Sequence, residues 1–157
     1  MNSPSDLYQQ INLHYHLPDQ LTLHPISIGL IHETYLLVAL SGERWIIQGL
    51  HPQLNSIAQL SDYEAVTRHL HQVGYPGPRL IKTQEGACTA EWEQRQWRLS
   101  TYVEGETITV VDSPQRASRG ARGLAQFHRA LQSISYDFQR SEEHTSELQS
   151  RQYLVCR

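Results

Sequence analysis

The sequence lacks several features that would assign it to a class at once. Of its 157 residues only two are cysteines, Cys88 and Cys156, and their spacing fits neither a disulfide framework nor a metal-ligand motif. No apolar run approaches the length of a membrane-spanning helix. The first residues, MNSPSDLYQQ, lack the basic start and apolar run of a secretory signal peptide. We therefore expect a reduced, cytoplasmic protein with no membrane partner.

Charge of either sign is also sparse. The chain carries 13 lysines and arginines against 16 acidic residues, which gives a net charge of -3. These charges form no basic stripe and no polybasic run, so the usual footprint of a nucleic-acid-binding protein is missing. Hydrophobic residues make up 39% of the chain, a typical content for a globular domain with its own core. The composition therefore predicts one globular domain without a nucleic-acid partner.

Along the chain, the hydrophobic period changes between that of strands and that of helices, which predicts an α+β fold. Ser113 and Pro114 supply a capping hydroxyl and a proline at the first helical position, so they predict the start of a long helix that runs to about Ile134. Two earlier helices are expected over residues 6–16 and 57–73. Strands are expected over residues 21–29, 34–40, 43–50, 79–82, 87–92 and 96–103.

A three-stranded meander followed by a helix and further strands is the plan of a kinase small lobe. We expect a mostly antiparallel sheet of about five strands with one packed helix, followed by the first helix of a large lobe. The turn in SIGLIHETYLL can lay backbone N–H groups over phosphates, although it lacks GxGxxG and, taken alone, suits an ordinary hairpin better. The phosphate-facing position of the third strand, a lysine in protein kinases, is Gln48 here.

Five segments in this order resemble the aminoglycoside phosphotransferase-like family, which has a protein-kinase-like fold. Within that family they are most similar to the branch of N-acetylhexosamine 1-kinases, in which glutamine is common on the third strand. The resemblance covers roughly residues 25–138, and no single motif in it is decisive. The five segments are GLIHETYLL, RWIIQGLHPQL, DYEAVTRHL, WRLSTYVEGET and GLAQFHRAL.

The resemblance implies a nucleotide site on this chain. A turn containing Gly29, His32 and Thr34 would cover the phosphates of ATP, and Gln48 would pair with Glu64 on the following helix. The backbone of the hinge, between Thr101 and Val103, would bind adenine, whereas Leu99 and Tyr102 equally suit the core. The nucleotide-binding residues expected from the resemblance are Gly29, His32, Thr34, Gln48, Glu64, Thr101 and Val103.

The residues that would perform phosphoryl transfer are not found. In this family a His-x-Asp loop with a downstream asparagine positions the acceptor, and an Asp-containing motif holds Mg2+. No histidine of this chain has an aspartate two residues later, so we assign no catalytic and no metal-binding residue. ATP and Mg2+ are therefore expected only for a parent enzyme that phosphorylates a sugar or similar hydroxyl metabolite. The alternatives are a kinase for an aminoglycoside, choline or homoserine, and a non-catalytic nucleotide-binding or interaction module.

The end of the chain, from Arg140 to Arg157, raises a separate question. Its first eleven residues, RSEEHTSELQS, back-translate into DNA that resembles a common sequencing-library adapter, although SEEHTSEL also suits a natural capped helix. We expect family similarity to stop at Arg140 and residues 140–157 to be a non-native tail. The expected organisation is an N-terminal helix over 1–18, a kinase-like lobe over 19–104, and a linker with the first helix of a truncated large lobe over 105–139.

Overall fold

The structure is a computed structural model that describes residues 4–27, 31–105, 108 and 110–138. It contains an antiparallel six-stranded sheet in the order β1-β2-β3-β6-β4, with β5 also paired to β6. The α+β small-lobe fold expected from the sequence is confirmed, with six strands in place of about five. The strands are β1 (Leu21–Ile26), β2 (Glu33–Ala39), β3 (Arg44–Gly49), β4 (Leu80–Ile81), β5 (Ala90–Trp92) and β6 (Arg95–Thr101).

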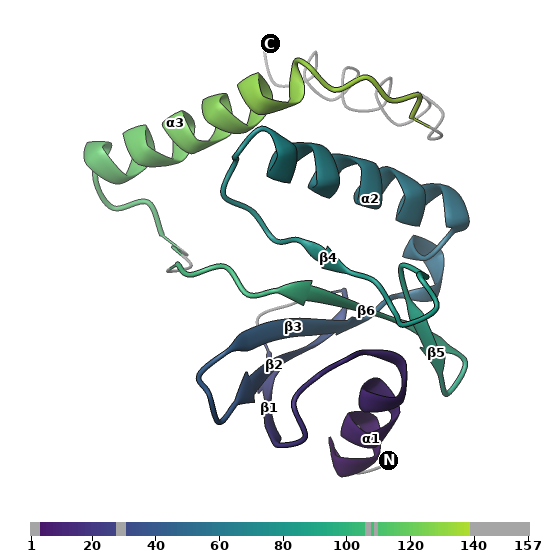
Figure 1. The fold of residues 1–157 in the computed structure, drawn as a ribbon. Helices are drawn as coiled ribbons and strands as arrows, with labels where there is room; N and C mark the ends of the chain where they lie inside the picture. The colour runs from purple at the N-terminus through teal and green to yellow at the C-terminus, as the bar shows by residue number, and fades with distance from the viewer. Residues whose placement is uncertain (1–3, 28–30, 106–107, 109, 139–157) are drawn as a thin grey trace.

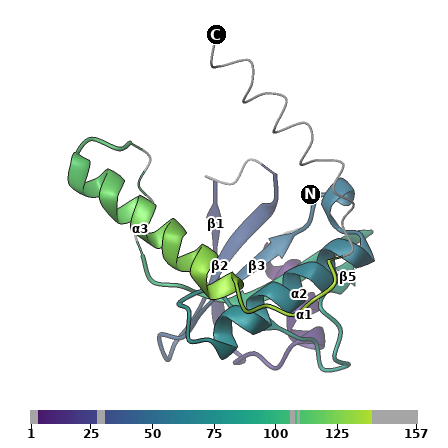
Figure 2. The same ribbon diagram turned by 90° about the horizontal axis from the view of Figure 1, so that it is seen from above.

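Three α-helices lie on the two faces of this sheet. Figure 1 shows α1 (Pro4–His14) on one face, with α2 (Ile57–Gln72) and α3 (Pro114–Leu131) on the other. A short 3-10 helix, η1 (Pro52–Leu54), connects β3 to α2. Seen from above in Figure 2, α2 crosses the sheet, whereas α3 approaches it only with the end that lies near α2 and otherwise extends to one side. The sheet therefore separates a face covered by α1 from a face that looks toward α2 and α3.

Strand periodicity explains why the first three strands form a meander. The register pairs Leu37 with Trp45 and Leu36 with Ile46, and successive side chains of each strand point to opposite faces. Gly42, in the turn between β2 and β3, has a φ of 88° that favours glycine. Further along the chain, β6 pairs with β3 and so joins the meander to β4 and β5.

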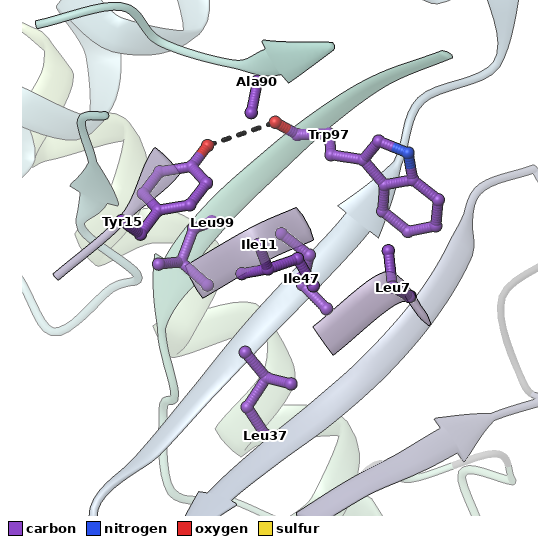
Figure 3. Close-up of a cluster of buried hydrophobic side chains, with 8 residues drawn as sticks. All are labelled: Leu7, Ile11, Tyr15, Leu37, Ile47, Ala90, Trp97 and Leu99. Atoms are coloured by element: carbon purple, nitrogen blue, oxygen red, sulfur yellow. Dashed lines mark hydrogen bonds between the residues drawn. The ribbon is translucent and has the colours of Figure 1, made fainter. Parts of the chain in front are cut away.

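The core lies between α1 and the sheet (Figure 3). Leu37, Ile47 and Leu99, from three neighbouring strands, are 0% exposed. From the other side, α1 and the residue that follows it bury Leu7, Ile11 and Tyr15 against these strands. Each such side chain contributes about 1.5–3 kcal/mol on burial. The cluster consists of Leu7, Ile11, Tyr15, Leu37, Ile47, Ala90, Trp97 and Leu99.

Tyr15 also joins α1 to β6 through a polar contact. Its hydroxyl donates a hydrogen bond of 3.2 Å to the carbonyl oxygen of Trp97 (Figure 3). Burial raises the pKa of Tyr15 to about 12, so the phenol stays protonated and remains a donor at neutral pH. The N-terminal helix is therefore an integral part of the lobe.

Capping residues set the starts of α2 and α3. Ser56 and Gln59 form a reciprocal capping box, in which each side chain accepts a hydrogen bond from the other residue's backbone N–H. Ser113 caps α3 with Pro114 at its first position, as predicted. The two helices touch where a ring nitrogen of His69 lies 2.9 Å from the carbonyl oxygen of Ala130, and Phe127 of α3 also meets the ring of Tyr75, just beyond the end of α2. None of the described helices is both long and apolar enough to cross a membrane.

Candidate functional site

A polar row crosses the sheet on the face opposite α1. Thr34, Gln48 and Arg98 are direct cross-strand neighbours on β2, β3 and β6. The guanidinium of Arg98 donates a hydrogen bond of 2.8 Å to Oε1 of Gln48. The Gln48 amide nitrogen in turn lies 3.5 Å from the Thr34 hydroxyl, at the limit of hydrogen bonding. Three strands thus hold one hydroxyl, one amide and one cation in a line.

An apolar patch adjoins this row on the same face. Leu36 and Ile46 are paired across β2 and β3, two residues along each strand from Thr34 and Gln48. Because side chains alternate along a strand, all four point to the same side of the sheet. Leu36 and Ile46 are half-buried, whereas their neighbours Leu37 and Ile47 belong to the core beneath. The face therefore combines a flat apolar area with a polar edge.

The turn before β2 adds a histidine to the polar edge. Nδ1 of His32 accepts a hydrogen bond of 3.2 Å from the backbone N–H of His51, just beyond β3. This bond fixes the neutral ring as the tautomer with its proton on Nε2. Burial first, and then the nearby charge of Arg98, lower the pKa of His32. At neutral pH the His32 ring is therefore an uncharged donor held beside the row.

Helix α2 contributes an aromatic ring to the same face. The guanidinium carbon of Arg98 lies 3.7 Å from the centre of the Tyr63 ring, close enough for a cation–π interaction. Burial lowers the pKa of the half-buried Arg98, because the protein replaces part of the water around its charge. Arg98 thus lies between β3 and α2 and contacts both.

The expected hinge follows β6 directly. The N–H of Thr101 donates to the carbonyl oxygen of Arg79, and the N–H of Tyr102 donates to that of Arg44. Arg44 also lies 4.4 Å from the centre of the Tyr102 ring and forms an ion pair with Glu104. These contacts fix the path of the chain out of the sheet and leave Val103, which is 43% exposed, between two anchored residues.

Glu64 does not lie where the sequence placed it. It was expected to pair with Gln48, but its carboxylate lies 2.7 Å from Nζ of Lys82 and 3.6 Å from Arg68. Lys82 directly follows β4, so the ion pair joins α2 to β4 instead of β3. The Lys82 partner lowers the pKa of Glu64. Both residues line a cavity of about 330 Å3 between α2 and β4, together with Thr67, Arg68, His71, Arg79 and Leu80.

Cys88 lies against the same carboxylate, and its titration provides a test of this arrangement. The thiol donates a hydrogen bond of 3.1 Å to Glu64, and burial together with this contact raises the pKa of Cys88 to about 11. In a Cys156→Ser background, we expect alkylation of Cys88 by iodoacetamide to rise with pH to a midpoint near that value. Glu64→Gln removes the negative charge, so the midpoint should fall.

The matched control for this experiment is Glu85→Gln, which removes a carboxylate from an exposed turn residue. It should leave the midpoint of Cys88 alkylation unchanged. A midpoint at the ordinary pKa of a thiol in the unmodified background would contradict the contact between Cys88 and Glu64.

The other predicted residues have different outcomes. His32, Thr34 and Gln48 lie together, and Thr101 and Val103 form the segment after β6. Gly29 lies outside the described residues. Leu99 belongs to the core, one of the two interpretations left open for it. Within the described part of the chain, no group of three or more histidine, cysteine, aspartate or glutamate side chains is arranged so that it could hold a metal ion.

Arg98, the cation of the polar row on the sheet face opposite α1, was not predicted from the sequence. The signal was an arginine inside WRLST, a segment expected to form a buried strand next to the hinge. Lys82 was missed for a different reason, since no pattern within β4 or α2 specifies that Glu64 turns toward it. Both residues became recognisable only once the strand register was known.

Comparison with known proteins supports the fold. An amicoumacin kinase in complex with AMP-PNP, Ca2+ and Ami aligns over 93% of this chain and 46% of its own, with a TM-score of 0.66 and 15% identity. An aminoglycoside phosphotransferase from Alicyclobacillus acidocaldarius aligns over 96% of this chain and 42% of its own, with a TM-score of 0.66 and 18% identity. A spectinomycin phosphotransferase in complex with ADP and spectinomycin aligns over 97% and 47%, with a TM-score of 0.62 and 12% identity.

At the level of sequence, a homoserine kinase from Hyphomonas neptunium is 28% identical over 117 residues. That match covers 74% of this chain, which spans only 35% of the relative's length. A model of the phosphotransferase enzyme family (APH) matches residues 22–154. We expected the similarity to the family to stop at Arg140, but the match continues to residue 154. The interpretation of residues 140–157 as translated adapter sequence is therefore not confirmed. Because the matched segment is most of the chain, the protein belongs to the phosphotransferase enzyme family.

Proposed function

We propose that this chain provides the ATP-binding small lobe of a phosphotransferase that acts on a hydroxyl group of a sugar or similar metabolite. The observation that carries the proposal is the face opposite α1, where the row of Thr34, Gln48 and Arg98 adjoins an apolar patch beside the expected hinge. A nucleotide has the same division into a flat apolar ring and a charged tail. The family match over residues 22–154 is independent support.

In this proposal the adenine ring lies against Leu36 and Ile46 and takes its hydrogen bonds from the backbone between Thr101 and Val103. The phosphates extend toward His32, Thr34 and Gln48, beneath the turn that includes Gly29. Glu64 has only a secondary role in this nucleotide site, because its carboxylate pairs with Lys82. Residues 1–18 and 19–104 together form the lobe, with the core between them, and residues 105–139 lead into the large lobe.

Phosphoryl transfer further requires a group that positions the acceptor hydroxyl. The sequence contains no His-x-Asp motif, so we expect no phosphotransferase activity from the 157-residue chain by itself. The hydroxyl acceptor has two alternatives besides a sugar. Similarity to the homoserine kinase of Hyphomonas neptunium supports an amino-acid alcohol as the acceptor, and similarity to the aminoglycoside and spectinomycin phosphotransferases supports an antibiotic. A nucleotide-binding module without catalysis is the alternative from another class.

Nucleotide binding tests the proposal directly. In an NMR titration of the 15N-labelled chain with ATP, we expect shifts of the amides of Thr34, Ile46 and Val103. Val103→Pro removes a hinge N–H and should weaken ATP binding about 3- to 10-fold, whereas Val110→Pro, at a position 66% exposed in the linker, should not. If millimolar ATP shifts no amide on this face, the proposal is wrong.

An activity assay tests the expected inactivity of this chain. A coupled assay for ADP release, run over sugars, homoserine and aminoglycosides, should show no turnover above the background of the buffer. Turnover with any acceptor would overturn the expected inactivity of this chain and would identify the acceptor at the same time.

A further inference from the structure

Arg98 occupies an unusual position for a charged residue. It lies on β6, a strand with partners on both sides, between the buried residues Trp97 and Leu99. Its own side chain is half-buried and turned toward the opposite face, against α2. Arginine is almost never fully buried in proteins unless it is paired, and Arg98 is half-buried. The surroundings of Arg98 therefore need to be examined for that partner.

The contacts of the guanidinium are all with neutral groups. One terminal nitrogen donates to Oε1 of Gln48, and the plane lies over the Tyr63 ring. Nε is buried and has no hydrogen-bond partner in the described structure. A guanidinium has five N–H donors, so these contacts leave most of its donor capacity unused. Of the ion pairs between described residues, none includes Arg98.

This arrangement is costly unless something else compensates it. A half-buried cation loses water and regains the free energy only through an opposite charge with good geometry. The neighbouring ionisable group, His32, is kept neutral and presents its Nε2 proton as a further donor. Around Arg98 the sheet face therefore offers a cation and several hydrogen-bond donors to one missing partner, which must be an anion.

Among the anions available to this face, a polyphosphate fits best. The hydroxyl of Thr34, the amide of Gln48 and the guanidinium of Arg98 form a line across three strands, and a chain of phosphate groups can follow a line. Arginine also binds phosphate oxygens with two parallel N–H groups, a geometry that lysine cannot offer. A single carboxylate would satisfy only one point of the row.

We propose that Arg98 is the phosphate-binding cation of this lobe and that Gln48 positions it. In protein kinases a lysine on β3 has this role. Here the charge comes from the next strand, β6, at the position directly opposite Gln48, and the Gln48 side chain holds the guanidinium in place. The proposal deepens the function proposed above and rests on it for the identity of the nucleotide.

Three ligands separate the phosphate site from the adenine site. Isothermal titration calorimetry of the full chain measures the affinity for tripolyphosphate, which reports the phosphate site, for adenosine, which reports the adenine site, and for ATP, which reports both. Arg98→Met should weaken tripolyphosphate and ATP about 10- to 100-fold, because charge-assisted bonds are lost, and should leave adenosine unchanged within about 2-fold. Arg98→Lys keeps the charge without the fork and should give an intermediate loss. Arg119→Met, which removes an exposed arginine from α3, is the matched control.

A charge exchange between the two strands is the sharpest form of the test. Gln48→Lys combined with Arg98→Gln moves the cation to β3, the strand that carries it in protein kinases, and keeps one glutamine and one positive charge in the pair. We expect the exchange to restore affinity for tripolyphosphate to within about 5-fold of the original chain. A purely structural role for Arg98 would not be rescued in this way. Circular dichroism and thermal melting confirm that each variant is folded before it is titrated.

Each outcome has a definite meaning. The proposal is overturned if the original chain does not bind tripolyphosphate, if Arg98→Met leaves that binding unchanged, or if it weakens adenosine equally. It is also overturned if the folded exchange variant fails to recover affinity. If tripolyphosphate binds through Arg98 while neither ATP nor adenosine shows binding of its adenine ring, the anion site stands and the kinase function fails.

Discussion

Replacing Leu99 with alanine is expected to destabilise the lobe by about 2–5 kcal/mol, because it deletes a side chain at the point where α1 meets the sheet. Leu99 is 0% exposed and lies within one cluster with Ile47, Ile11 and Tyr15. A single domain has a total stability of about 5–15 kcal/mol, so the loss is a large part of it. Urea denaturation followed by circular dichroism measures the change in the free energy of unfolding.

Leu40→Ala is the matched control for this prediction. Leu40 is 82% exposed at the end of β2, so the same deletion should change the free energy of unfolding by less than about 0.5 kcal/mol. A loss below about 1 kcal/mol for Leu99→Ala would mean that the cluster beneath the sheet is not the core of this protein.

Gln48→Glu should make the chain more stable and a weaker nucleotide binder at the same time. The substitution places a carboxylate where Oε1 now accepts the 2.8 Å hydrogen bond from Arg98. The hydrogen bond from the guanidinium is already charge-assisted, and the new carboxylate turns it into an ion pair between two opposite charges. After a partial cost of desolvation, we expect a gain of about 1 kcal/mol in the free energy of unfolding. The new charge then occupies Arg98 and repels phosphates, so affinity for ATP should fall about 100-fold.

The pH dependence of this gain follows from the pair itself. The cation beside the new carboxylate lowers its pKa in the folded chain. The extra stability is therefore complete above the ordinary pKa of glutamate, about 4.3, and is lost as the pH falls through the lower folded value. Thermal melts of Gln48→Glu and the original chain at a series of pH values measure the difference. A variant that is less stable at neutral pH, or that binds ATP as before, would contradict the arrangement of Gln48 and Arg98.

Local patterns in the sequence were sufficient to predict the elements of this fold. The alternation in TYLLVAL and RWIIQGL identifies β2 and β3, and Ser113-Pro114 locates the start of α3 to the residue. Strand ends were less accurate. The first strand, expected over 21–29, ends at Ile26, and β5 begins at Ala90, not at residue 87. These ends depend on where a partner strand stops, which the local sequence does not contain.

The site could be predicted only in part, for a related reason. Thr34 and Gln48 belong to consecutive strands, and His32 lies in the turn just before the first of them, so a hairpin register brings the three together from local information. Arg98 is separated from Gln48 by 50 positions, with α2, β4 and β5 between them. The partner of Glu64 could not be predicted for a similar reason. Lys82, just beyond β4, competes with Gln48 on β3 for the carboxylate and offers it a full positive charge. Long-range register and charge competition decided both cases.

The contact between α1 and β6 has a consequence for the order of events during synthesis. The hydrogen bond from Tyr15 to Trp97 joins residues 82 positions apart, and the same pair of elements closes the core. When the ribosome has made the meander of β1 to β3, the apolar side of that sheet still has no complete cover, because α1 cannot be fixed until β6 emerges. The nascent chain therefore carries incompletely covered apolar surface from the completion of β3 until β6 emerges, and chaperones act on chains in that condition.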